Sequence, residues 1–135
     1  MTPDDRRLAV VQEMIDAWNT QNWERVIDLF GDDGVLHSMM VEPIKGRESI
    51  GARIRHMGEG IEQITLNIKH IGVIDGVVFL ERVDEFRYNG HDGKVPVVGV
   101  IEVEGDRIKE WREYYDRQEL LDAMGLAQDF DAEAR

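Results

Sequence analysis

In the first half of the chain, apolar residues recur every three or four positions, which is the spacing of an amphipathic helix. Such stripes predict three helices: one that begins at Thr2, a short second one, and a third at about 47–57. Their apolar faces consist of Leu8, Val11, Ile15, Trp18, Trp23, Val26, Ile27, Phe30, Ile50, Ile54 and Met57. Between the second and third helices we expect a turn at 31–34 and a strand at 35–41.

From about residue 64 onward, apolar residues alternate with polar ones, which is the pattern of a half-buried strand. The predicted strands are 64–70, 77–88, 95–104 and 107–116. Asp75-Gly76 is a two-residue hairpin signal, 89–94 has the composition of a polar loop, and Pro96 fits best at the beginning of its strand. A closing helix is expected at 117–126, and residues after Gln128 have the composition of a solvated tail.

This order of elements indicates an α+β domain, in which helices cover one face of a curved antiparallel sheet. A length of 135 residues suits one domain with one core, so we assign residues 1–135 to a single unit. No repeat or linker divides the chain.

Composition narrows the classes of function. The net charge of −12 argues against binding to nucleic acid or to an anionic membrane surface. The chain has no cysteine, which excludes disulfides, thiolate nucleophiles and sulfur-ligated metals. No apolar run approaches the roughly 20 residues that cross a bilayer, and the first residues lack the pattern of a secretory signal. We therefore expect a cytoplasmic protein.

Two segments carry the candidate chemistry, because alternate side chains of a strand share a face. One face carries Arg82, Asp84 and Phe86, and another carries Trp111, Glu113 and Tyr115. If the two faces meet, an arginine lies with two carboxyl groups among aromatic rings, where charge is costly unless it is paired. This predicts an acid/base site. The simpler alternative is a surface ion pair of Arg82 with Asp84, and an exposed Glu113.

The four histidines show no spacing typical of a metal site, and we expect no metal. His37 faces away from Ser38 in a regular strand, although a bulge there would turn His37 inward as an alternative base. His70 follows the alternation of the strand that contains it, which predicts a core position.

From about Val10 to Leu126 the sequence resembles the limonene-1,2-epoxide hydrolase family, within the nuclear transport factor 2-like superfamily. The resemblance is strongest at 81–84, at Gly99-Val100 and at 111–116. There the family motifs read E-R-V-D and W-R-D-Y-F-D, against E-R-V-D and W-R-E-Y-Y-D here. The resemblance implies a cone-shaped α+β fold, whose curved antiparallel or mixed sheet has helices packed on its concave face.

The resemblance also implies roles for individual residues. Arg82 matches an arginine that bridges two carboxyl groups, and Asp84 matches the acid that protonates an epoxide oxygen. Glu113 takes the place of an aspartate base that activates water. The family holds this water with a Tyr and an Asn, at whose positions this chain has Leu36 and Ser38. Ser38 is thus the candidate for positioning water.

The implied substrate is a small apolar epoxide, opened to a diol without a metal or organic cofactor, and the implied assembly is a homodimer. The residues expected to form the substrate pocket are Ile15, Trp18, Leu36, Met57, Ile61, Leu66, Phe86, Val97, Trp111, Tyr115 and Leu126.

Two other classes of function remain open. A cyclase or isomerase of the same superfamily is the first, and an epoxide-opening cyclase needs no positioned water, which fits Leu36. A non-catalytic ligand-binding dimer module is the second, because one fold hosts many functions.

Overall fold

The computed structural model describes residues 1–127, which form four helices and a six-stranded sheet. The helices are α1 (Pro3–Asn19), α2 (Trp23–Asp28), α3 (Arg47–Gly60) and α4 (Arg117–Ala123). The strands are β1 (Phe30–Ser38), β2 (Ile44–Lys45), β3 (Ile61–Ile74), β4 (Val77–Tyr88), β5 (His91–Glu104) and β6 (Arg107–Tyr114). The predicted tail after Gln128 lies outside the described residues.

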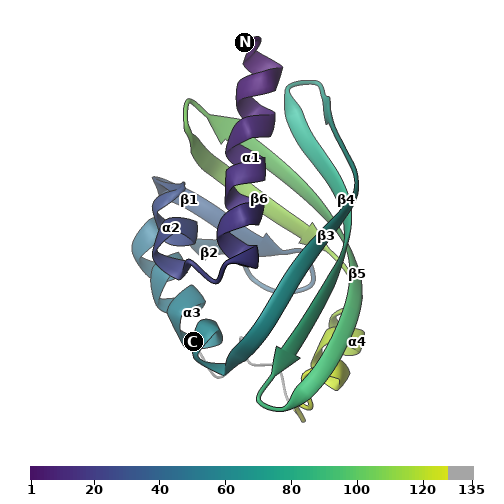
Figure 1. Cartoon of the computed structure of the whole chain (residues 1–135). Coiled ribbons are helices and arrows are strands. Elements are labelled where there is room, and N and C mark those ends of the chain that lie inside the picture. Colours follow the sequence, from purple (N-terminus) through teal and green to yellow (C-terminus); the bar gives the residue numbers. More distant parts are fainter. Residues whose placement is uncertain (128–135) are drawn as a thin grey trace.

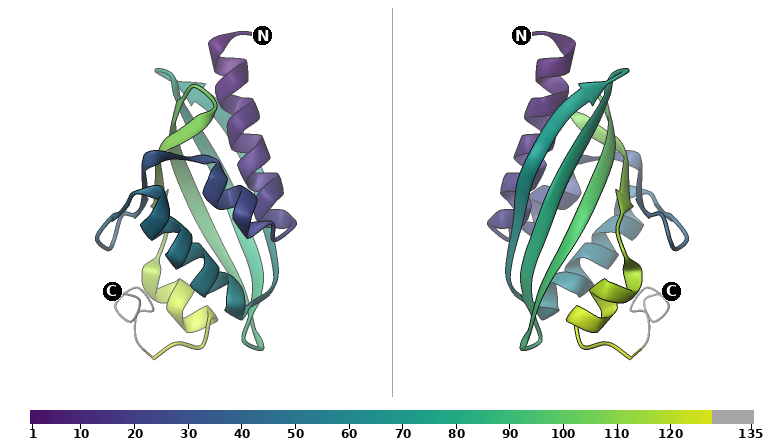
Figure 2. Two further views of the ribbon diagram at one scale, coloured as in Figure 1. Left: turned by 90° about the vertical axis from the view of Figure 1, so that its left-hand side faces the viewer. Right: turned by 90° about the vertical axis from the view of Figure 1, so that its right-hand side faces the viewer.

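The sheet is mixed and curved, with strand order β2-β1-β6-β5-β4-β3. Every pair is antiparallel except β1 with β6. Helices α1, α2 and α3 lie on one face, and α4 lies beside one end of the sheet (Figures 1 and 2). The α+β class is therefore confirmed, with helices on the concave face. No helix within residues 1–127 is long and apolar enough to cross a membrane.

The main core lies between α1 and the concave face of the sheet. Val11, Met14 and Ile15 of α1 are almost fully buried, together with Leu80 and Ile101 from the sheet. The predicted start of this helix is confirmed by a capping box, since the Asp5 amide donates to Thr2 Oγ1 at 3.1 Å and the Thr2 amide donates to Asp5 Oδ2 at 3.0 Å.

Two predicted loops are wrong, because most of their residues lie in strands. Residues 31–34 lie within β1, at a shift of register against β6, and the pairing of Phe30 with Ile108 holds them to the sheet. Of the predicted loop 89–94, only Asn89-Gly90 forms a turn, with φ of 45° and 84°. The polar residues that follow are exposed strand positions rather than loop.

Pro96 is also misplaced by the prediction, since it is inside β5 and not at its beginning. Strand β6 pairs with β5 only from Val98 onward, so β5 has a neighbour on one side only at Pro96. A missing N–H is tolerated at such an edge position. The closing helix is shorter than predicted: α4 ends at Ala123, and Gly125 follows with a φ of 71°.

Candidate active site

An ion-pair cluster of Arg82, Asp84 and Glu113 lies on the concave face of the sheet. Arg82 donates from Nε to Asp84 Oδ1 at 2.8 Å and from Nη2 to Asp84 Oδ2 at 3.1 Å. It also donates from Nη1 to Glu113 Oε2 at 2.9 Å and from Nη2 to Glu113 Oε1. The two predicted strand faces therefore meet, and one guanidinium bridges both carboxyl groups.

This bridge spans an intervening strand. Arg82 belongs to β4 and Glu113 to β6, while β5 lies between them with Gly99 opposite Glu113. A Cβ atom on Gly99 would lie 3.0 Å from Arg82 Nη1 and 3.2 Å from Glu113 Oε2. Because glycine has no side chain, the guanidinium can cross β5 close to its backbone.

Alanine at position 99 is expected to lower both stability and any activity of the site. Its methyl group would also lie 2.9 Å from Leu80 Cδ2, so Arg82, Glu113 and Leu80 would all have to move. Overpacking of this kind typically costs about 1–3 kcal/mol. Chemical denaturation of Gly99→Ala measures the loss, with Gly72→Ala as control because a Cβ there meets nothing within 4 Å. Equal stability of the two variants would contradict the expected crowding.

The electrostatics of the cluster favour retention of a proton. Burial raises the pKa of Asp84 and of Glu113 above their ordinary values, although the charge of Arg82 opposes the shift. Burial works against the charge of Arg82 too, but the two carboxylates outweigh it and raise the pKa of Arg82. Two ionised carboxylates with one arginine would leave a net negative charge in an apolar cavity. One shared proton removes that charge.

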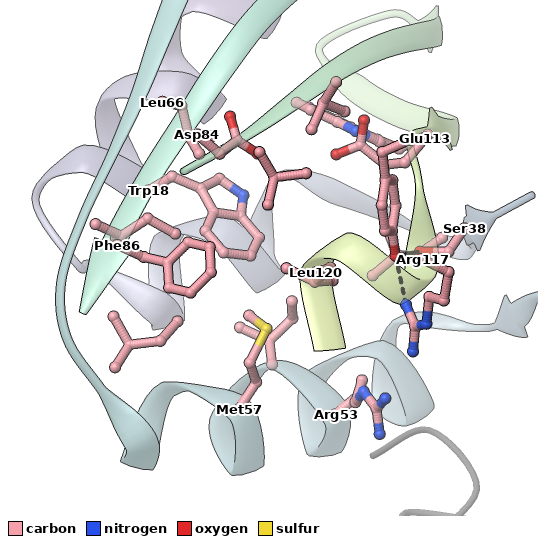
Figure 3. A pocket seen from close by; sticks show the side chains of 18 of the residues that line it. Trp18, Ser38, Arg53, Met57, Leu66, Asp84, Phe86, Glu113, Arg117 and Leu120 are labelled. Atoms are coloured by element: carbon pink, nitrogen blue, oxygen red, sulfur yellow. Dashed lines mark hydrogen bonds between the residues drawn. The ribbon is translucent and has the colours of Figure 1, made fainter. Parts of the chain in front are cut away.

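A second polar group lies beside the cluster. Ser38 of β1 is paired in register with Glu113 of β6. The Tyr115 hydroxyl donates to Ser38 Oγ at 2.9 Å, and Nη1 of Arg117 donates to the Tyr115 hydroxyl oxygen. Ser38, Glu113 and Tyr115 therefore share one wall of the cavity, as Figure 3 shows for Ser38, Glu113 and Arg117.

The cluster opens into a cavity of about 160 Å³. Cavities near 150 Å³ can hold a benzene-sized ring, so the space suits a small alicyclic molecule. In Figure 3, Asp84 and Glu113 lie at one end of the pocket, and Met57 and Arg53 of α3 lie at the other. The predicted water-positioning residue Ser38 lines this cavity. Of the predicted pocket residues, those that line it are Trp18, Leu36, Met57, Ile61, Leu66, Phe86, Val97, Trp111 and Tyr115.

Two of the predicted pocket residues are wrong. Ile15 is only 1% exposed and packs in the core beneath α1, away from the cavity. Leu126 follows the end of α4 and does not line the cavity, whereas Leu120 and Met124, one helical turn apart, do. The lining residues that sequence reasoning missed are Phe30, Val41, Glu42, Ile44, Arg53, Ile54, Ile64, Tyr88, Val95, Arg117, Leu120 and Met124. Helical spacing to Met57 could have indicated Ile54, and strand alternation with Val97 could have indicated Val95.

Neither His37 nor His70 lines the cavity. His37 Nε2 lies 3.0 Å from the Val41 carbonyl oxygen, and His37 is not among the lining residues. The prediction of a core position for His70 is wrong, because its side chain is 85% exposed and pairs with Glu81. A bulge at Lys69 shifts the register of β3 and reverses the alternation.

Within residues 1–127, no group of three His, Asp or Glu side chains could hold a metal ion.

The fold and the site define a class: an α+β cone with two arginine-bridged carboxyl groups in an apolar pocket. The limonene-1,2-epoxide hydrolase catalytic domain matches residues 6–125 of this chain. The protein therefore belongs to the limonene-1,2-epoxide hydrolase family.

Several individual proteins are similar to this chain. Epoxide hydrolase EphG of Mycobacterium tuberculosis is 26% identical over 114 residues, which are 84% of this chain and 76% of EphG. The solved structure of an LEH-like epoxide hydrolase from M. tuberculosis has a TM-score of 0.80 at 24% identity, and the match covers 91% of this chain and 92% of that one. A candidate polyketide cyclase from Xanthomonas campestris has a TM-score of 0.81 at 19% identity, covering 91% and 99%. At these identities the solved structures support the fold alone.

Proposed function

We propose that this protein is a cofactor-independent epoxide hydrolase that opens a small apolar or alicyclic epoxide to a vicinal diol in one step. The observation that carries the proposal is the guanidinium of Arg82 between two buried carboxyl groups on an apolar cavity. Membership of the limonene-1,2-epoxide hydrolase family supports the same reaction class.

In the proposed reaction, Asp84 is the acid and Glu113 is the base. The carboxyl O–H of Asp84 protonates the epoxide oxygen while the carbon–oxygen bond breaks. Glu113 takes a proton from a water molecule whose oxygen forms the new bond to that carbon. Transfer of one proton from Glu113 back to Asp84 restores the starting state. Arg82 remains charged and stabilises whichever carboxyl group is ionised.

Incubation with a panel of epoxides in water labelled with oxygen-18 tests the proposal. We expect a diol that contains one labelled oxygen atom, detected by mass spectrometry. The protein needs no added metal or cofactor in this assay, so dialysis against a chelator should leave the rate unchanged. Absence of diol from every epoxide in the panel would refute the hydrolase proposal.

An epoxide-opening cyclase is the second candidate. The specific observation in its favour is Leu36, an apolar side chain on the cavity wall at a position where the family has a water-binding Tyr. In a cyclase, an internal hydroxyl of the substrate replaces the water as nucleophile. An epoxy-alcohol substrate in the same labelled water distinguishes the two reactions, because a cyclic product without label indicates the cyclase.

The homodimer and the cytoplasmic location stay predictions. The uncovered face of the sheet, on which the resemblance implies dimerisation, carries the cross-strand pair Val98 and Tyr114, which are 40% and 45% exposed. The structure supports the proposed substrate class through the cavity, whose apolar wall includes Trp18, Phe86 and Met57.

A further inference from the structure

The hydroxyl of Tyr115 is a feature that neither the ion-pair cluster nor the family motif explains. Where the family motif has phenylalanine, this chain has Tyr115, whose hydroxyl donates to Ser38 Oγ at 2.9 Å. At the two positions where the family has water-binding side chains, this chain has Leu36 and Ser38. The chain thus lacks one hydroxyl on β1 and has an additional one just after the end of β6, and both positions line the same cavity.

Arg117, Tyr115 and Ser38 form a chain of hydrogen bonds in which each residue donates to the next. An arginine can only donate, so the Tyr115 oxygen accepts from Arg117. The single O–H of Tyr115 is then directed to Ser38, whose Oγ accepts it. A serine hydroxyl that accepts one hydrogen bond still has its own O–H to donate. Ser38 is the register partner of Glu113, so that O–H is available on the wall where the proposed base lies.

We propose that Tyr115 is a positioning residue for the attacking water and acts through Ser38. The Tyr115 hydroxyl fixes the orientation of Ser38, so that Ser38 donates to the water molecule from which Glu113 removes a proton. This inference rests on the proposed hydrolase function and deepens it. Burial raises the pKa of Tyr115 although Ser38 and Arg117 oppose the shift, so the phenol keeps its proton and remains a donor at neutral pH.

The test is a double-mutant cycle on diol formation with Tyr115→Phe, Ser38→Ala and the double variant. Each single variant is expected to lower kcat by about tenfold, the effect of losing one hydrogen bond near the upper end of its usual range, with KM nearly unchanged. If Tyr115 acts through Ser38, the double variant should be no slower than either single variant. Multiplied losses, roughly a hundredfold in the double variant, or an unchanged kcat in Tyr115→Phe, would overturn the proposal.

A second readout separates water positioning from general damage to the site. Azide attacks an epoxide carbon without needing a base, and Asp84 can still protonate the oxygen as the carbon–oxygen bond breaks. In Tyr115→Phe the ratio of azido-alcohol to diol should therefore rise, whereas a misfolded site would lose both products together. Tyr114→Phe is the matched control, since Tyr114 is the neighbouring residue at the end of β6 and is 45% exposed, and its ratio should equal that of the wild type.

The outcomes also separate this inference from the proposed function. No diol from the wild-type protein refutes the hydrolase function, and the role of Tyr115 with it. Diol from the wild-type protein, with an unchanged product ratio in Tyr115→Phe, refutes the role of Tyr115 alone.

Discussion

Replacement of Asp84 by asparagine is expected to lower kcat for epoxide opening by about 100- to 10,000-fold, the range over which a positioned general acid acts. Asparagine has nearly the same shape as aspartic acid but has no carboxyl proton to give to the epoxide oxygen. Burial raises the pKa of Asp84, which favours the protonated form that an acid needs. Steady-state kinetics on the epoxide that the wild-type protein hydrolyses fastest measures the effect.

Glu85→Gln is the matched control for Asp84→Asn. Glu85 is the adjacent carboxylate of β4, points to the opposite face, and pairs at 3.7 Å with Lys94 in an exposed position. The same chemical change there should leave kcat unchanged. Thermal unfolding of both variants checks that Asp84→Asn retains the fold. Wild-type activity in a folded Asp84→Asn variant would show that the acid is another group.

The sequence predicted the ion-pair cluster because strand parity is a local property. Arg82 and Asp84 are two residues apart on one strand, so they share a face wherever that strand lies in the sheet. The same holds for Trp111 and Glu113 of β6, and Tyr115 follows directly after that strand. The meeting of the two faces across β5 is a non-local fact, which strand parity cannot predict and which only the family resemblance implied. The role of Gly99 became visible once Glu113 was seen opposite it.

Bulges in β3 limit what strand alternation can predict. One bulge, at Glu62, places Ile61 on the same face as Ile64 and Leu66, although their spacing does not predict it, and only the family resemblance placed Ile61 in the pocket. A second bulge, at Lys69, moves His70 out to solvent. An inserted residue moves every later side chain of its strand to the opposite face. No residue type predicts where such an insertion occurs.

The sequence also did not predict several residues of the helices that line the cavity. Arg53 and Arg117 both line the cavity, one from α3 and one from α4. How a helix is rotated and placed over a sheet depends on the packing of its neighbours, and these fall far away in the sequence. Charged residues on a short helix also fit a solvated face, which is the more common position for them.

Methionine in place of Arg82 is expected to give the largest loss of stability. Arg82 has a side chain only 4% exposed, and its removal leaves Asp84 and Glu113 buried without a countercharge. Breaking a buried pair in this way costs about 3–5 kcal/mol. Arg87→Met is the matched control on the same strand: Arg87 is 44% exposed, and its surface pairs with Glu62 and Asp92 should each contribute at most about 1 kcal/mol.

The pH dependence of the Arg82→Met loss identifies its cause. Burial already raises the folded-state pKa of both carboxyl groups, and removal of Arg82 removes the charge that most strongly opposes that shift. A group whose pKa is raised on folding contributes most stability below its unfolded pKa, near 4 for these residues, and loses it as pH rises through the folded value. Denaturant titrations should therefore show a large deficit against the wild type at pH 7 that shrinks toward pH 4. A deficit that is constant over this range would mean that lost packing, rather than buried negative charge, destabilises the variant.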